Sequence, residues 1–306
     1  MNALRVFKVG TRASRLARWQ ADWVIAALGA RFPGTPFETV TITTDGDTDR
    51  ATPLPELGGA GVFSGAIERA LREGTIDLAV HSLKDLPADD SADLVLAAVG
   101  SREDPRDVLV AREDWTLEDL PLGARVGTCS TRRTAQVLAR RRDVTILPLR
   151  GNVETRERKV QRGDYDAIVL ASAGLRRLGL ADAITEYLSL DWFLPAPGQA
   201  ALAVQCRADD YMTRELAVSL DDPVVHAATT AERAFLAELG GGCAAPVGAF
   251  AGALPREGLV LRGFVGSLDG QIHVRVTGRA PLEGAAALGR RLATDAMARG
   301  AGALLV

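Results

Sequence analysis

The chain has few of the residues that a disulfide framework or a metal centre requires. Its 306 residues include three cysteines, Cys129, Cys206 and Cys243, and three histidines, and their spacing matches no metal-binding motif. Apolar runs are also short: none approaches the ~20 residues that cross a bilayer, and the N-terminus shows no export signal. We therefore expect reduced thiols, no metal, no membrane partner and a cytoplasmic location.

Lysine is almost absent. Lys8, Lys84 and Lys159 are the only lysines, so arginine supplies nearly all of the positive charge. The formal net charge is −3, which argues against a general nucleic-acid binder. Arginine presents a planar fork of donors that can bind both oxygens of a carboxylate at once. The composition therefore fits a protein that recognises carboxylates.

Hydrophobic patterning predicts two doubly wound α/β domains followed by a small α+β domain. Apolar runs alternate with helical patterns, which is typical of sheets whose ligands lie beyond the carboxyl ends of the strands. The expected strands are residues 4–9, 37–44, 75–80, 124–128, 145–149 and 166–171, with an apolar run at 94–99. Residues 193–207 contain two prolines and then a further strand, which predicts a segment that crosses back to the first domain. After residue 217, alternation with a DG turn predicts a three-stranded antiparallel sheet. The predicted domains are residues 1–98 with 199–216, residues 99–198, and residues 217–306.

In three places an arginine follows an expected strand and opens an expected helix. These arginines are Arg12 in GTRAS, Arg132 with Arg133 in GTCSTRR, and Arg150 with Arg156 in RGNVETR. A helix N-terminus carries unpaired N–H groups and partial positive charge, so added arginines make an anion site. Each arginine alone is readily explained as a solvated helix cap, but the repetition favours a ligand with several negative groups.

The motif HSLKDLP places Ser82, Lys84 and Asp85 at the end of an apolar strand. An aspartate before Leu-Pro is usually a turn or cap residue. Its functional interpretation requires a cationic partner, because an ionised carboxylate in a partly dry cleft stabilises positive charge and can relay a proton. Asp85 is therefore a candidate catalytic residue.

The stretch LGGGCAAPVG raises the question of what its cysteine does. Three glycines before Cys243 permit close approach of the backbone, and a loop position leaves the sulfur reachable. An unpaired cysteine is nevertheless more often a small buried hydrophobe, and reactivity needs an accessible thiolate. Cys206 lies within the apolar run LAVQCR and is the stronger core candidate, whereas Cys129 lies in a turn.

Nine motifs occur along the chain in a characteristic order. They are GTRAS, VHSLKDLP, SREDPRD, VGTCSTRR, RGNVETR, AIVLASAGLRRLG, LPAPGQAALAVQCR, TAERAF and GGCAAPVG. Together they resemble the hydroxymethylbilane synthase family, also called porphobilinogen deaminases. The resemblance implies a three-domain transferase whose first two domains are similar to type II periplasmic binding proteins. It also implies that four porphobilinogen molecules are joined head to tail with loss of ammonia, to give linear hydroxymethylbilane for porphyrin biosynthesis.

The resemblance also assigns roles to individual residues. Cys243 matches the cysteine that carries a dipyrromethane cofactor through a thioether bond, and Asp85 matches the catalytic aspartate. Residues similar to those holding the cofactor's carboxylates are Lys84, Thr128, Ser130, Arg132 and Arg133. Residues similar to those receiving substrate rings are Arg12, Ser14, Gln20, Ser82, Arg150, Arg156, Arg177 and Gln199.

The chain departs from the family pattern at a few positions. Ala60 stands where the active-site loop often has lysine, Cys129 stands where serine is common, and GQAA (198–201) replaces GQGA. Phosphate binding at the same turns lacks support because no Walker-type sequence is present. We expect a monomer that binds the small molecule porphobilinogen and no nucleic acid. The alternative is a non-catalytic cytoplasmic dicarboxylate-binding or sensor protein.

Overall fold

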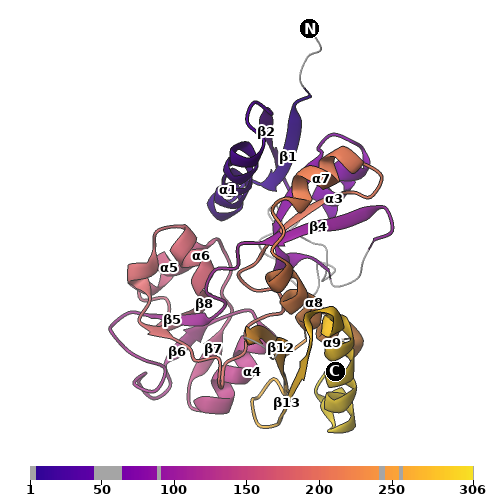
Figure 1. Ribbon diagram of the computed structural model, residues 1–306. Coiled ribbons are helices and arrows are strands. Elements are labelled where there is room, and N and C mark those ends of the chain that lie inside the picture. Colours follow the sequence, from indigo (N-terminus) through magenta and orange to yellow (C-terminus); the bar gives the residue numbers. More distant parts are fainter. Residues whose placement is uncertain (1–4, 45–63, 88–90, 241–244, 255–257, 306) are drawn as a thin grey trace. The chain divides into compact units, whose positions relative to one another are not determined.

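The computed structural model describes residues 5–44, 64–87, 91–240, 245–254 and 258–305 (Figure 1). The chain divides into two compact units. The first contains Met1–Arg102 and Ala201–His226, and the second contains Glu103–Ala200 and Ala227–Val306. Within the described ranges, no helix is long and apolar enough to cross a membrane.

The first unit is built on a five-stranded sheet with the order β2-β1-β3-β10-β4. Its strands are β1 (Phe7–Arg12), β2 (Phe37–Ile42), β3 (Leu78–Ser82), β4 (Leu94–Gly100) and β10 (Leu202–Arg207). Strand β1 is parallel to β2 and β3, whereas β10 runs antiparallel to β3 and β4. Because β10 comes from beyond residue 200, the chain returns to this sheet after building most of the second one.

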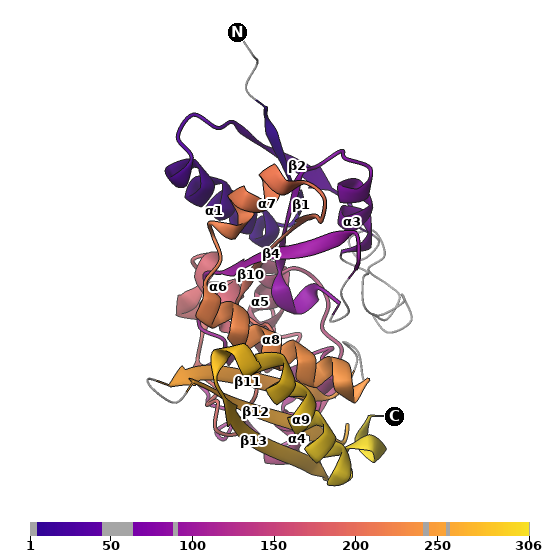
Figure 2. The same cartoon turned by 45° about the vertical axis from the view of Figure 1, so that its right-hand side comes forward.

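Helices cover both faces of this sheet (Figure 2). The helices are α1 (Arg15–Arg31), α3 (Gly65–Arg72) and α7 (Tyr211–Val218). Val24 of α1 and Leu216 of α7 share a buried cluster with Val80, whereas Ile67 of α3 packs with Ala79. Side chains of adjacent strand residues point to opposite faces, so α1 and α7 lie on one side and α3 on the other.

The second unit contains a sheet of similar design, with the order β7-β6-β8-β5-β9. Its strands are β5 (Asp107–Ala111), β6 (Arg125–Gly127), β7 (Thr145–Leu147), β8 (Ala167–Ala171) and β9 (Glu186–Tyr187). Its helices are α4 (Thr131–Arg140), α5 (Val153–Gln161) and α6 (Ser172–Arg177). Val137 of α4 packs on one face, and Val160 of α5 and Leu175 of α6 pack on the other. Strand β5 runs antiparallel to β8 and β9.

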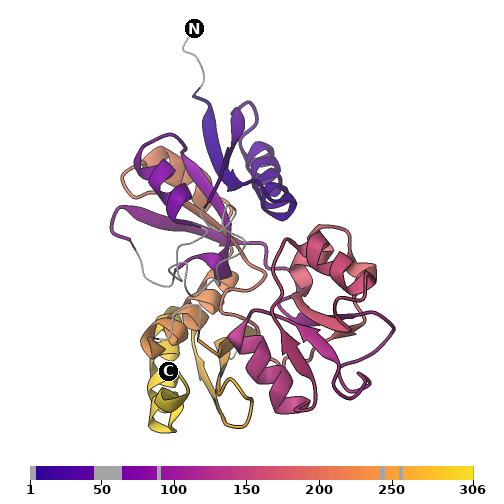
Figure 3. The same cartoon turned by 180° about the vertical axis from the view of Figure 1, so that it is seen from behind.

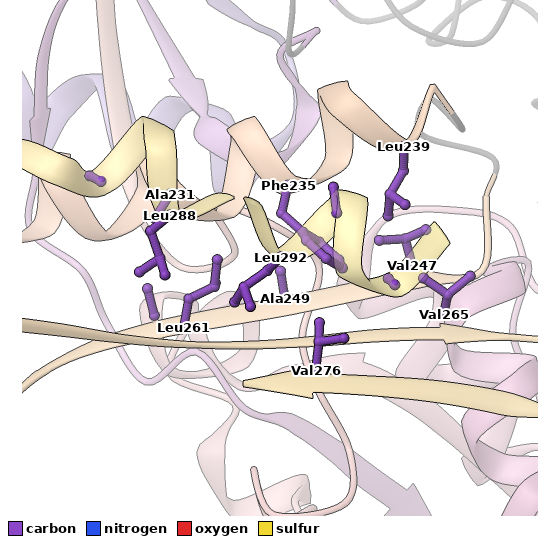
Figure 4. Close-up of a cluster of buried hydrophobic side chains, with 14 of the residues drawn as sticks. Ala231, Phe235, Leu239, Val247, Ala249, Leu261, Val265, Val276, Leu288 and Leu292 are labelled. Carbon is purple, nitrogen blue, oxygen red and sulfur yellow. The ribbon is translucent and has the colours of Figure 1, made fainter. Parts of the chain in front are cut away.

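A three-stranded antiparallel sheet completes the second unit. Its elements are β11 (Val247–Leu254), β12 (Gly258–Gly266), β13 (His273–Ala280), α8 (Pro223–Leu239) and α9 (Ala285–Ala298). Phe235 of α8 and Leu292 of α9 fill one buried cluster with Leu261 of the sheet (Figure 4). The sheet also lies beside α4, through the buried side chains Ala135 and Phe264 (Figure 3).

The predicted fold class is confirmed, with two differences in detail. Each predicted α/β domain contains a five-stranded sheet covered on both faces, and the predicted antiparallel sheet is present. Both larger sheets are mixed rather than all parallel, because β10 and β5 enter them antiparallel. The elements β5, β9 and α7 were not expected from the sequence. The three domain boundaries stay predictions, since residues 103–200 and 227–306 form one compact unit.

Ala200 has a left-handed backbone, with φ of 74°. Its carbonyl oxygen accepts hydrogen bonds from Arg177 Nη2 at 2.7 Å and from Glu103 N at 3.2 Å. These two bonds hold the residue in a conformation that costs an L-amino acid about 1–2 kcal/mol and costs glycine almost nothing. The alanine of GQAA therefore stores local strain that the glycine of the usual family motif avoids.

We expect Ala200→Gly to raise the thermal unfolding midpoint by about 1–2 °C, because relief of the Cβ strain exceeds the added chain entropy. Differential scanning calorimetry measures this shift. The matched control is Ala201→Gly at the next position, where φ is not positive and glycine should lower the midpoint. A lower midpoint for Ala200→Gly would contradict the assignment of strain.

Candidate functional site

A small pocket lies at the carboxyl ends of β1 and β3 in the first unit. Its volume is ≈ 60 Å³, and the residues that line it are Arg12, Ser14, Leu16, Ala17, Gln20, Val80, His81, Ser82 and Asp85. Neighbouring parallel strands end at the same sheet edge, which is where α/β proteins place their ligands. The structure thus brings together five residues that the sequence predicted for the site: Arg12, Ser14, Gln20, Ser82 and Asp85.

Local hydrogen bonds fix the helix side of the pocket. Ser14 caps α1, and its hydroxyl accepts a hydrogen bond from Ala17 N at 3.2 Å. Thr11 Oγ1 donates to the Ala17 carbonyl at 3.0 Å, which ties the strand end to the first turn of α1. One turn later, buried Gln20 donates from Nε2 to Ser82 Oγ at 2.8 Å. These contacts join the GTRAS and HSLKDLP motifs on one wall of the pocket.

Asp85 ends the single 3₁₀ turn Leu83–Asp85, which follows β3 directly. Leu83 is fully buried and its N–H donates to the Ala201 carbonyl at 3.0 Å, which fixes the turn to the segment before β10. The Asp85 side chain is partly buried. Among the residues that the structure describes, none forms a hydrogen bond or an ion pair with its carboxylate. The carboxylate is therefore available to a ligand in the pocket.

His81 also lines this pocket, and the sequence analysis did not single it out. The side chain is 7% exposed. Burial lowers the pKa of His81 to about 4, the neighbouring Gln205 amide opposes this shift, and the charge of Arg12 adds to it. The imidazole is therefore uncharged at neutral pH. Its position inside the HSLKDLP motif was the only available signal, because burial cannot be inferred from one histidine on a strand.

In the second unit, Arg132 and Arg133 share one buried carboxylate, Asp107. Arg132 Nη1 lies 2.6 Å from Asp107 Oδ2, and Arg133 Nη2 lies 2.7 Å from Oδ1. Gln199 Nε2 donates to the same Oδ1 at 3.1 Å. The exposed fractions of the two arginines are 4% and 7%, so they are not solvated helix caps. Burial lowers the pKa of Arg132, and the Asp107 charge opposes that shift.

The two arginines differ in how many guanidinium nitrogens remain available to a ligand. Arg133 uses all three guanidinium nitrogens, two toward Asp107 and Nη1 toward the Val169 carbonyl at 2.9 Å. Arg132 uses only Nη1, toward Asp107 and the Leu194 carbonyl. Its Nε and Nη2 have no hydrogen-bond partner within the described part of the chain. Arg132 can therefore donate two further bonds to a carboxylate ligand.

The first turn of α4 is shaped by its own polar side chains. Ser130 caps the helix and accepts from Arg133 N at 3.4 Å, and Thr128 Oγ1 accepts from Ser130 N at 3.1 Å. Asp107 itself was missed, although it belongs to the SREDPRD motif. Its role depends on β5, which the sequence pattern did not predict.

The remaining predicted residues lie at the ends of other elements. Arg150 and Arg156 lie in the connection from β7 into α5, where Arg156 Nε donates to the Gly151 carbonyl at 2.6 Å. Burial lowers the pKa of Arg177 to about 10, and the charge of Glu103 opposes this shift. Lys84 is partly buried in the 3₁₀ turn of the first unit.

The three cysteines differ in what the structure shows. Cys243, the predicted attachment residue, and Ala60 lie outside the described residues. Cys206 is fully buried in the first unit, and burial raises the pKa of its thiol to about 11, which confirms the prediction of a core cysteine. Cys129 is exposed, and its Sγ accepts a hydrogen bond from Leu149 N at 3.2 Å.

Comparison with known proteins gives matches along nearly the whole chain. Residues 7–215 match the family model described as "Porphobilinogen deaminase, dipyromethane cofactor binding domain", and residues 226–298 match the "Porphobilinogen deaminase, C-terminal domain". A porphobilinogen deaminase of Syntrophotalea carbinolica is 49% identical over 97% of this chain and 94% of its own length. That of Roseiflexus castenholzii is 50% identical over 97% of both chains.

Solved structures of binding proteins align more distantly. The VFT2 domain of Bordetella pertussis BvgS is 16% identical, with a TM-score of 0.42 over 70% of this chain and 86% of that domain. A probable amino-acid ABC transporter extracellular-binding protein of Bacillus subtilis is 14% identical, also with a TM-score of 0.42, over 71% and 91%. These scores are too low to add to the assignment. The two family models and the near-full-length relatives decide it: the chain belongs to the porphobilinogen deaminase family.

Proposed function

We propose that this chain is a hydroxymethylbilane synthase, which condenses four porphobilinogen molecules head to tail, releases one ammonia for each and then frees the linear product by hydrolysis. The observation that carries the proposal is the unpaired carboxylate of Asp85 in a pocket lined by Arg12, Ser14, Gln20 and Ser82. A carboxylate and an arginine that line one pocket suit a substrate that has both acidic arms and a ring that becomes cationic.

Asp85 acts on the developing positive charge. When the C–N bond of the aminomethyl group breaks, its electron pair leaves with ammonia and the ring nitrogen lone pair forms a methylene-pyrrolenine cation. A carboxylate without a competing partner stabilises that cation in the partly dry pocket. It also accepts the proton that is lost when the next pyrrole carbon has attacked and the ring regains its aromaticity.

Arginines receive the acetate and propionate arms. Arg12 contributes its charge to the pocket next to the N-terminus of α1, which also favours anions. Arg150, Arg156 and Arg177 with Gln199 bind the arms of the elongating chain in the second unit. Support comes from the position of Arg150 and Arg156 between the end of β7 and the first turns of α5.

The cofactor site fits a group that carries carboxylates. Bound dipyrromethane would supply a nucleophilic pyrrole carbon and a tether for the product. Arg132 offers two unused donors beside a helix N-terminus, and Asp107 holds its guanidinium in place. Arg133, Ser130, Thr128 and Lys84 complete the binding set, with Arg133 contributing charge rather than new hydrogen bonds because its nitrogens are already occupied. Cys243 forms the thioether. A monomeric state and a cytoplasmic location stay predictions from the sequence.

Intact-protein mass spectrometry tests the function and the anchor together. Protein purified from cells that make porphobilinogen should be heavier than its sequence by one dipyrromethane, and added porphobilinogen should give a ladder of one-ring steps. Cys243→Ala should remove the adduct, because the proposed thioether is formed by that sulfur, whereas Cys206→Ala should keep it. An unmodified wild-type mass would support the dicarboxylate-binding alternative, and an adduct on Cys243→Ala would disprove the anchor.

Asp85→Asn should retain the fold and lower kcat by at least ~100-fold, since the amide keeps the shape but removes the charge that offsets the cation. A steady-state assay of product formation measures the loss. The control is Asp22→Asn on the exposed face of α1, which should change kcat less than about twofold. Activity of Asp85→Asn close to that of the wild type would remove this residue from the mechanism.

Asp107→Asn should lower the free energy of unfolding by about 3–5 kcal/mol, because it leaves two buried guanidinium groups without their carboxylate. The released Arg132 side chain should also fail to load the cofactor. Urea unfolding and intact mass measure the two effects. Asp104→Asn is the matched control: its pair with Arg106 is partly exposed, so loading should persist and stability should change by less than ~1 kcal/mol. Full loading of Asp107→Asn would refute the positioning role.

A further inference from the structure

Gln136 is a buried polar residue that has no role in the chemistry described above. It lies one helical turn after Arg132 on α4, and its exposed fraction is 1%. Its amide forms two hydrogen bonds with one residue: Nε2 donates to the Leu194 carbonyl at 3.0 Å, and Oε1 accepts from Leu194 N at 2.7 Å. Residues paired across an antiparallel sheet exchange the same two bonds, so the amide acts like a neighbouring strand.

The residue that Gln136 holds is also a partner of Arg132. The Leu194 carbonyl accepts from Arg132 Nη1 at 2.8 Å. The same nitrogen donates to Asp107 Oδ2 at 2.6 Å, so both of its hydrogens are used. The guanidinium also lies over the ring of Phe193, with its carbon atom 5.9 Å from the ring centroid. Two acceptors and a ring therefore fix the orientation of the Arg132 guanidinium.

This orientation leaves the carboxylate-binding edge of Arg132 available. Nε and Nη2 lie on one side of the planar guanidinium, and together they match the two oxygens of a carboxylate. Within the described part of the chain neither atom has a hydrogen-bond partner. Both atoms keep accessible surface although the residue as a whole is buried, so a ligand can reach them.

Leu194 depends on the amide because it belongs to no helix or strand. The chain between β9 and β10 runs through turns and extended backbone. The Leu194 side chain packs with Ala135 of α4 and Phe264 of β12, whereas its backbone N–H is held by Gln136. Without the amide, Leu194 N would be buried without a partner, and the carbonyl that holds Arg132 would lose its second donor.

We propose that Gln136 is a positioning residue for the dipyrromethane site: by fixing Leu194, it holds Arg132 with its Nε–Nη2 edge available before a cofactor carboxylate binds. The proposal rests on the function proposed above and adds a residue that touches neither substrate nor cofactor. It follows from the shared Leu194 carbonyl, on which the amide of Gln136 and the guanidinium of Arg132 converge.

The neutral charge of Gln136 is part of this role. Its Nε2 and Arg132 Nη1 are neighbours, because both donate to one oxygen. A glutamate at this position would place a second carboxylate beside the guanidinium, in addition to Asp107. The internal carboxylate would then compete with the ligand for Arg132.

Loading of cofactor-free protein tests the proposal. Protein made in cells without porphobilinogen is mixed with porphobilinogen, and intact-protein mass spectrometry follows the gain of the dipyrromethane mass with time. Gln136→Met keeps the length of the side chain and removes both hydrogen bonds to Leu194, so loading should slow about 10- to 100-fold, the range of one hydrogen bond to a charged group. Gln136→Glu keeps the acceptor for Leu194 N and should be similarly slow, because its carboxylate competes for Arg132.

Val137→Ala is the matched control for stability. Val137 is the next residue of α4, is fully buried and packs in the core of the second unit, so its truncation should lower the thermal unfolding midpoint as Gln136→Met does. Its loading rate should stay within about twofold of the wild-type rate. Unchanged loading in Gln136→Met or recovery in Gln136→Glu would overturn the proposal. Equal slowing in Gln136→Met and Val137→Ala would also overturn it, because loading would then follow stability alone.

A second measurement does not depend on the folding of Gln136→Met. In Cys243→Ala protein labelled with ¹⁵N-arginine, the two Nη1 protons of Arg132 should give separate resonances, because each has its own acceptor and rotation about the Cζ–Nη1 bond is hindered. One averaged resonance would refute the fixed orientation. If the wild-type protein gains no dipyrromethane mass, the proposed function fails; if it does and Gln136→Met loads equally fast, only this inference fails.

Discussion

The buried carboxylate of Asp107 connects three segments of the second unit through ion pairs and a hydrogen bond. One strand end, the first turn of α4 and the segment before β10 meet at this group, through Arg132, Arg133 and Gln199. Moving ions out of water costs several kcal/mol each, which close pairing offsets only when the remaining donors are satisfied. These contacts set two positive charges against one negative charge, and a carboxylate ligand would complete the balance.

The two five-stranded sheets share a strand arrangement but differ in the polar side chains at their strand ends. Each receives an antiparallel strand next to its third strand, and each ends its parallel strands in basic and hydroxyl side chains. In the first unit the result is a pocket with an unpaired carboxylate, Asp85. In the second unit, the carboxylate of Asp107 pairs with Arg132 and Arg133.

Local sequence patterns predicted most of the elements and five of the residues that line the pocket. Short motifs such as GTRAS and HSLKDLP mark where a strand ends and a helix begins. What escaped prediction depends on contacts between distant segments. Strand β5 has only five residues after a charged run, and it is defined by pairing with β8 and β9. The buried position of Asp107 depends on that pairing. The neutral state of His81 results from burial. Similarly, the sequence predicted that Arg132 and Arg133 bind the carboxylates of a ligand, yet both pair with Asp107 of the same chain.

The backbone at Ala200 has a wider consequence for how the chain passes between its units. The described non-glycine residues with positive φ are Ser101, at 45°, and Ala200, at 74°, and both lie within two residues of a unit boundary. The third passage, after His226, is inside the continuous helix α8. Linkers between compact units are usually loose and open to proteases. Here two of the crossings contain a residue in the narrow left-handed region and the third lies within a helix, so the backbone at each crossing has fewer accessible conformations than an open loop.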